Sequence, residues 1–129
     1  MELEERCRRI VDAVRARRIE DELVHPEFVF TSLLAATEGA TYSGPAGLRD
    51  WAREVDEIWE GFDPVMAEFV PVDAQRAVIV FRVSGRARSS GVPLDSERAM
   101  VWTFREGRLC RSDAYPGRSE ALAAVGLGA

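Results

Sequence analysis

Three side chains capable of acid–base chemistry alternate near the end of the chain, in the segment CRSDAYPG at residues 110–117. One residue separates Arg111 from Asp113, and one separates Asp113 from Tyr115. Alternate residues of a β-strand point to the same face of its sheet. A cation, a carboxylate and a phenol on one face form either a proton-transfer site or the ion-paired outer side of a sheet. We favour the outer side, where arginines hold Asp113 ionised and make it a poor general acid. A β-bulge in this strand would instead turn Asp113 inward.

The residue types that are scarce exclude several kinds of chemistry. All 17 basic residues are arginine, so no lysine amine is available for Schiff-base catalysis. The single histidine, His25, is too few for a histidine metal site or a catalytic triad. Cys7 and Cys110 lack metal-ligand spacing and are too few for a disulfide framework, so we expect reduced thiols in the core. The sequence therefore predicts no metal site and no cofactor.

Charge and hydropathy restrict the partners and the location. The formal net charge is −5, whereas proteins that bind nucleic acid usually carry a basic face. No apolar run approaches the roughly 20 residues that a membrane span needs. The first residues, MELEERCRR, are charged and lack the apolar core of a secretory signal. We expect no nucleic-acid partner, no membrane partner and a cytoplasmic location.

Apolar spacing and turn residues predict the elements that position these side chains. Leu3, Cys7, Ile10 and Val14 recur at helical spacing, and a Gly-Pro pair opens a second apolar-striped helix over residues 44–62. A short helix is expected near residues 19–23 and another over 119–125. Strands are expected over residues 27–34, 64–72, 76–89, 92–105 and 108–115. This order predicts one α+β domain over residues 1–129, with helices on one face of a mostly antiparallel sheet.

Two of these strands are apolar on both faces. They contain the segments AVIVF at residues 77–81 and AMVWTF at residues 99–104. Helices cover one face, and the other face would be exposed in a monomer. A large apolar sheet face usually marks an interface, so we predict a homodimer packed through the sheet.

Several segments, in order, resemble the SnoaL-like branch of the nuclear transport factor two-like superfamily. They are VHPEFVFTS, TYSGPAGLRDW, SSGVPLD, VWTFREGRLCR and EALAAVGL, and they span most of the chain from residue 24 onward. The resemblance implies a curved sheet wrapped by helices into a cone with an internal pocket. Such proteins include polyketide cyclases, ketosteroid isomerases, limonene-type epoxide hydrolases and non-catalytic members, so the fold alone gives no function.

The resemblance also locates where catalytic relatives carry polar groups. Their last strand supplies an acid seven places after a hairpin glycine, which from Gly107 is Ala114. Asp113 lies one residue earlier, on the opposite face of a strand. The position two before Ala114, often histidine in cyclase-like members, is Ser112.

The remaining polar positions are also replaced. The Tyr-x-Asn of epoxide hydrolases aligns with Phe30 and Ser32, and their Arg-x-Asp aligns with Phe81 and Val83. We therefore do not expect epoxide hydrolysis by that mechanism.

In this register an apolar, aromatic interior is expected, of the kind that holds a small hydrophobic molecule. Its expected lining is Phe30, Ser32, Phe81, Val83, Met100, Trp102, Ser112 and Ala114, closed by Trp51 and Trp59. Arg98 is expected on the same inward-facing side of its strand as Met100 and Trp102, near the mouth of the cone. It either pairs with a ligand carboxylate or is a rim residue paired with Glu97, Asp95 or Glu68. The alternative for the aromatic residues is that they simply fill a packed core.

Three functions follow as hypotheses. The first is a protein that binds a small hydrophobic molecule and lacks the usual acid–base residues of the family. The second is a cyclase- or isomerase-like enzyme that uses Asp113 or Glu68 without a metal. The third is a dimerisation module without a pocket.

Overall fold

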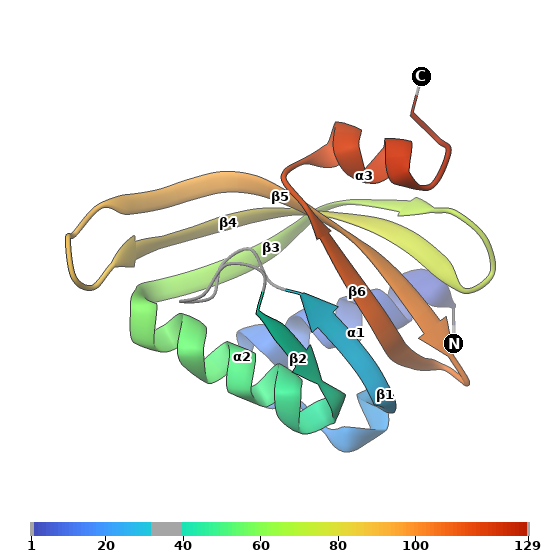
Figure 1. Ribbon diagram of the computed structural model, residues 1–129, viewed down its shortest axis with the longest axis horizontal. Helices are drawn as coiled ribbons and strands as arrows, with labels where there is room; N and C mark the ends of the chain where they lie inside the picture. Colours follow the sequence, from blue (N-terminus) through green and yellow to red (C-terminus); the bar gives the residue numbers. More distant parts are fainter. Residues whose placement is uncertain (1, 32–39, 129) are drawn as a thin grey trace.

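The computed structural model describes residues 2–31 and 40–128. Its helices and strands follow one another in the order shown in Figure 1. They are α1 (Leu3–Arg15), the 3-10 helix η1 (Asp21–Leu23), β1 (Val24–Thr31), β2 (Thr41–Ser43), α2 (Gly44–Ile58), β3 (Trp59–Pro71), β4 (Arg76–Ala87), β5 (Pro93–Arg105), β6 (Arg108–Tyr115) and α3 (Arg118–Ala124). No helix in this part of the chain is long and apolar enough to cross a membrane.

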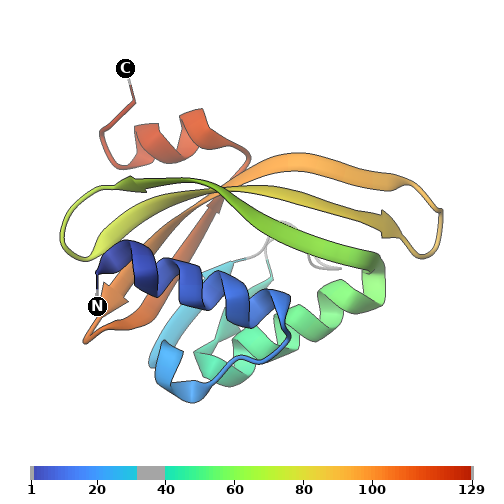
Figure 2. The same cartoon turned by 180° about the vertical axis from the view of Figure 1, so that it is seen from behind.

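In the described residues the strands form one six-stranded curved sheet in the order β2-β1-β6-β5-β4-β3. Neighbouring strands are antiparallel except for β1 and β6, which are parallel. Helices α1 and α2 lie on one side of the sheet and α3 lies on the other (Figures 1 and 2). The predicted α+β class with a cone-like, mostly antiparallel sheet is confirmed.

Two predicted boundaries were wrong. The helix expected to run to residue 62 ends at Ile58, and Trp59 already has the extended backbone of β3. The GFDP segment continues this strand because its pairing with β4 shifts register between Glu60 and Asp63 and so absorbs the irregularity. Residues 41–43, expected in a loop, form the edge strand β2 beside β1.

The second apolar face of the sheet is covered within the chain. Val78, Val80, Ala99 and Val101 are buried there together with Ala121 and Leu122, the last two from α3. The expectation that this face would be open in a monomer was therefore wrong, because α3 is amphipathic and packs on it. Two valines at strand positions remain more than two-fifths exposed, Val29 at 42% and Val65 at 41%.

Candidate functional site

The larger apolar cluster lines a partly open cavity between the inner face of the sheet and helices α1 and α2. The centre of a water molecule can move within a volume of about 50 Å³ in this cavity. The helices and β1 contribute Ile10, Val11, Val14, Leu48, Trp51, Phe28 and Phe30 to its wall. The other strands contribute Phe62, Pro64, Phe81, Val83, Arg98, Met100, Trp102, Leu109 and Ser112. Almost every lining side chain is apolar, so the cavity favours a hydrophobic occupant.

Aromatic rings form much of this wall. The rings of Phe30 and Trp51 meet edge to face with centroids 5.2 Å apart, and Trp51 meets Phe62 in the same way at 6.0 Å. Across the cavity Phe81 and Trp102 lie 5.7 Å apart. Edge-to-face pairs of this kind hold their rings in fixed orientations, so the wall is preformed.

The indole of Trp102 is fixed by a buried hydrogen bond. Its Nε1 donates to Ser112 Oγ at 2.9 Å, and Ser112 Oγ lies 3.4 Å from Met100 Sδ. Trp102 is 5% exposed and Ser112 is 3% exposed. The hydroxyl of Ser112 is thus already engaged with two neighbours and is poorly placed for proton transfer to a ligand.

Eight of the residues expected to line the interior lie at this cavity: Phe30, Trp51, Phe81, Val83, Arg98, Met100, Trp102 and Ser112. Ala114 lies opposite Met100 but outside the cavity wall, and it is half-buried. Trp59 packs against the same core without reaching the cavity, because it begins β3 beyond the end of α2. Ser32 lies outside the described residues.

Arg111 and Asp113 lie on the outer face of the sheet. Asp113 lies opposite Val101, whose side chain belongs to the apolar cluster under α3, and Arg111 Nε donates to both Asp113 oxygens at 3.0 and 2.9 Å. A register shift does occur in β6, between the pairs Thr103–Arg111 and Phe104–Leu109. It precedes Asp113, so Ser112 points into the cone and Asp113 points out. Arg111 and Asp113 form an ion pair on this surface, and Tyr115 packs against the apolar cluster under α3. Arg82 pairs with Asp95 and not with Asp113.

Glu68, the second candidate acid or base, also lies away from the cavity. Arg118 of α3 donates to both of its carboxylate oxygens, at 2.7 and 3.0 Å. These hydrogen bonds hold the pKa of Glu68 below its usual range. A carboxylate kept ionised by a fixed guanidinium is a poor general acid and a weak base near neutral pH. The pair instead anchors α3 to β3.

Arg98 lies where the inner parity of β5 predicts. It is opposite Phe81 and its side chain lines the cavity wall. It is the one charged residue among the described residues of that wall.

Two buried polar contacts were not anticipated from the sequence. Tyr42 donates a short hydrogen bond to Glu54 across the β2–α2 junction, and burial together with this carboxylate raises the pKa of Tyr42 to about 12. His25 is 8% exposed and accepts a hydrogen bond from the Glu27 amide while its other ring nitrogen lies 3.3 Å from Glu106. Neither Tyr42 nor His25 lines the cavity. Both fix strand ends in place.

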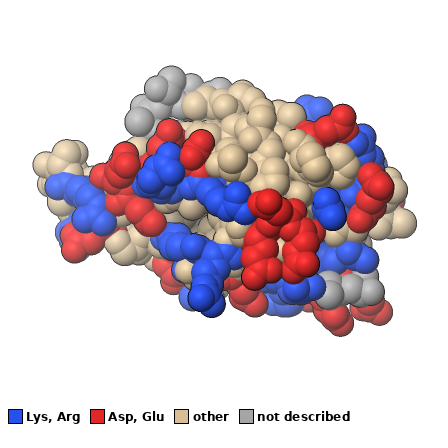
Figure 3. Space-filling model, turned by 90° about the horizontal axis from the view of Figure 1, so that it is seen from below, with Lys and Arg blue, Asp and Glu red and all other residues tan. Residues whose placement is uncertain are grey.

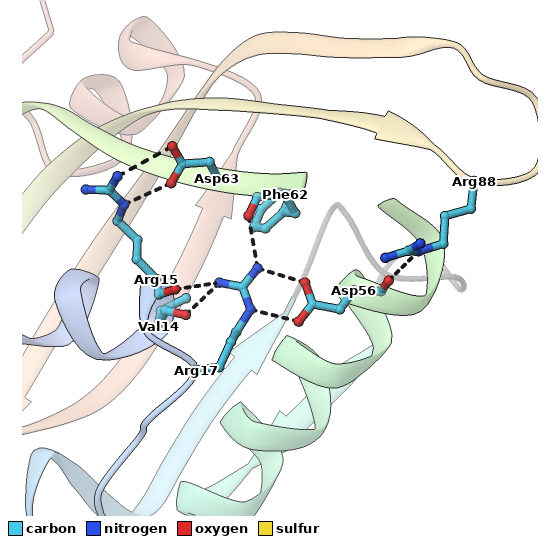
Figure 4. A network of polar contacts seen from close by, with 7 residues as sticks. All are labelled: Val14, Arg15, Arg17, Asp56, Phe62, Asp63 and Arg88. Carbon is cyan, nitrogen blue, oxygen red and sulfur yellow. Dashed lines mark hydrogen bonds and ion pairs between the residues drawn. The ribbon is translucent and has the colours of Figure 1, made fainter. Parts of the chain in front are cut away.

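A charged network lies beside Phe62 (Figure 4). Arg17, just after α1, donates to both carboxylate oxygens of Asp56 at 2.7 Å and to the carbonyl oxygen of Phe62 at 2.9 Å. These hydrogen bonds lower the pKa of Asp56. Arg15 donates to Asp63 of β3 at 2.8 Å. The network joins α1, α2 and β3, and so it holds Phe62 in the cavity wall.

The surface on the helical side of the molecule carries both positive and negative side chains. Figure 3 shows basic side chains interleaved with acidic ones there. A shallow groove between α1 and α2 has the same mixture, with Arg18, Arg49 and Arg53 beside Glu20 and Glu57. Nucleic-acid binding uses a continuous basic surface, which this face lacks.

No metal-ligand cluster of three or more His, Cys, Asp or Glu side chains occurs in residues 2–31 and 40–128. Cys7 is fully buried, and burial raises the pKa of its thiol to about 12. Such a thiol stays protonated and unreactive. Cys110 is also a free cysteine.

The sequence matches the family model of the SnoaL-like domain over residues 7–112. The chain belongs to the SnoaL-like domain family. This match contains every lining residue of the cavity, from Ile10 to Ser112. No curated protein matches the sequence.

Solved structures share the fold of this SnoaL-like chain. A protein from Catenulispora acidiphila with a ketosteroid isomerase-like fold, in complex with trimethylamine, is 16% identical with a TM-score of 0.73, covering 98% of this chain and 95% of that one. TerC co-crystallised with polyporic acid is 20% identical with a TM-score of 0.72, covering 95% of each chain. A candidate polyketide cyclase from Sinorhizobium meliloti is 20% identical with a TM-score of 0.69, covering 86% of this chain and 94% of that one.

Proposed function

We propose that this SnoaL-like protein binds a small hydrophobic molecule in the cavity between the sheet and helices α1 and α2. The observation that carries the proposal is the wall itself, which is aromatic and almost wholly apolar. Rings held edge to face present fixed apolar surfaces to an occupant. Two neighbours of the same fold hold small molecules, trimethylamine and polyporic acid, which supports a binding role for this architecture.

The lining argues for binding over acid–base catalysis. Within the described residues the wall has no Asp, Glu or His. Asp113 and Glu68, the carboxylates that a cyclase- or isomerase-like mechanism would use, are paired with arginines on the other side of the sheet. The enzyme hypothesis thus has no proton-transfer group at the cavity to support it.

The size of the cavity limits the occupant. On the same measure of volume, a cavity that holds one water needs roughly 10–15 Å³. The 50 Å³ present therefore accommodates a few small groups. A ligand with an aromatic ring enters if Met100 changes rotamer, since methionine is unbranched and adapts easily. We therefore propose a ligand of about one ring and not a large polycycle.

A blocked cavity tests the proposal. Val83 is 2% exposed in the wall, so Val83→Phe fills the space, whereas Val65→Phe makes the same change on the exposed outer side of β3. A panel of neutral one-ring aromatic compounds is titrated while the fluorescence of Trp51 and Trp102 is recorded. Binding should occur in the wild type and in Val65→Phe and be lost in Val83→Phe, with far-UV circular dichroism showing that all three are folded. Binding that survives in folded Val83→Phe, or no binding to the wild type, would contradict the proposal.

A homodimer packed through the sheet and a cytoplasmic location remain proposals. The exposed valines Val29 and Val65 on the outer face support self-association, but α3 leaves less apolar surface for it than the sequence alone suggested. Two free cysteines support a reducing compartment.

A further inference from the structure

Among the described residues, one charged side chain lines the apolar cavity, and its hydrogen-bonding capacity is only partly used. Arg98 Nε is buried and has no hydrogen-bond partner among the described residues. Nη1 donates to the Glu97 carbonyl oxygen at 3.0 Å, a contact to backbone that leaves the charge unneutralised. A guanidinium carries five N–H donors in a planar fork. The side chain is therefore a cation at a hydrophobic wall with donors to spare.

The three carboxylates named above as possible partners of Arg98 are engaged elsewhere. Glu97 is one residue away and so points to the opposite face, where its Oε2 accepts from the backbone amide of Arg118 at 3.2 Å. Asp95 pairs with Arg82, and Glu68 pairs with Arg118. No described carboxylate forms an ion pair with Arg98. Of the two alternatives for Arg98, the ion pair with one of these three carboxylates does not form.

The outer part of the guanidinium remains partly accessible to water, but its Nε–H is buried. A buried donor without an acceptor is unfavourable unless something binds it, and a counter-charge also satisfies the cation. A carboxylate fits the guanidinium fork with two parallel hydrogen bonds, and such pairs are stronger where water is excluded. Ser96, two residues earlier on the same face of β5, adds a second buried group without a partner among the described residues, its Oγ.

We infer that Arg98 binds the carboxylate of a small aromatic acid whose ring occupies the cavity beside Met100 and Trp102. This inference rests on the proposed binding function and adds the ligand's charge and orientation. Arg98, Met100 and Trp102 follow one another on the inner face of β5, so the polar end and the apolar end of one ligand meet successive side chains. Arg98 then acts as the residue that selects acids over neutral molecules of the same shape.

Matched acid and amide probes test the inference. Phenylacetate and phenylacetamide have the same shape and differ in charge, and each is titrated by calorimetry into the full chain. We expect phenylacetate to bind about tenfold more tightly or better, the usual gain from a charge-assisted hydrogen bond. Arg98→Met should abolish this preference and leave phenylacetamide binding within about twofold, because methionine keeps the apolar stem.

A second arginine gives the matched control. Arg82→Met makes the same change on the outer side of the neighbouring strand, where Arg82 pairs with Asp95, and it should keep the full preference for the acid. If Arg98→Met does not fold, Arg98→Lys keeps the charge without the planar fork and should lose most of the preference. Equal binding of acid and amide by the wild type overturns the inference while the proposed function stands. A preference retained in Arg98→Met also overturns it. If neither probe binds the wild type, both the inference and the proposed function fail for this class of ligand.

Discussion

Removing the hydroxyl of Ser112 should destabilise the wall of the cavity through Trp102. The Trp102 Nε1–H donates to Ser112 Oγ at 2.9 Å inside the protein, where the indole is 5% exposed and water does not replace a lost acceptor. Ser112→Ala leaves this donor unsatisfied, which costs about 1–3 kcal/mol. The contact from Ser112 Oγ to Met100 Sδ, at 3.4 Å, is weak and contributes little. For a chain of this size we expect a Tm lower by roughly 4 °C per kcal/mol.

A double-mutant cycle separates the hydrogen bond from the packing. Trp102→Phe removes the donor, so Ser112→Ala should cost much less in the Trp102→Phe background than in the wild type, with a coupling of about 1 kcal/mol or more. Urea unfolding is followed by far-UV circular dichroism, because the substitution changes the fluorescence. Ser84→Ala, on the exposed face of β4, is the matched control and should stay within about 0.5 kcal/mol. The hydrogen bond does not hold the indole if Ser112→Ala costs no more than Ser84→Ala. The same conclusion follows if the free-energy changes of Ser112→Ala and Trp102→Phe simply add in the double mutant.

Three further substitutions test the outer face of the sheet. Because Arg118 lowers the Glu68 pKa, this pair stabilises the fold above the unfolded-state pKa, and the contribution is lost as the pH falls through the lower folded-state pKa. Glu68→Gln should therefore be less stable than the wild type in urea at neutral pH and equal to it in strong acid; a difference that persists in acid would contradict this. Asp113→Asn breaks an exposed pair and should change the unfolding free energy by less than about 1 kcal/mol with no effect on titrations of neutral aromatic probes; lost probe binding would restore Asp113 as a site residue. Leu122→Ala thins the cover that α3 provides and should cost about 2–3 kcal/mol in urea unfolding and increase binding of an apolar dye; unchanged stability would mean that α3 does not seal this face.

The faces to which strand residues point could be predicted because successive side chains of a β-strand alternate between the two faces of the sheet. The strand over residues 108–115 has the predicted bounds, and Ser112 and Asp113 point to the predicted opposite faces. The turn at Glu106 and Gly107 was also correct, since both residues have positive φ, 55° and 77°.

The predictions that were wrong concern tertiary contacts, which no local sequence pattern encodes. The sequence shows α3 as a short amphipathic helix but not the face on which it packs, so the cover over Val78 and Val101 was missed. The hydrogen bond between Tyr42 and Glu54 joins an edge strand to a helix, and the edge strand itself was read as a loop. The volume of the cavity results from how side chains from five strands and two helices meet, which residue spacing does not determine.

The parallel pairing of β1 with β6 has a kinetic consequence. Phe30 lies opposite Ser112, so two walls of the cavity come from strands near opposite ends of the sequence and meet only after a long loop has closed. Contacts of such high sequence separation form slowly, because the entropy of loop closure is lost before the contacts compensate for it. A ligand that contacts the face formed by both strands binds only the paired arrangement. Its presence should therefore slow unfolding as well as shift the equilibrium, so that occupancy sets the lifetime of the folded chain.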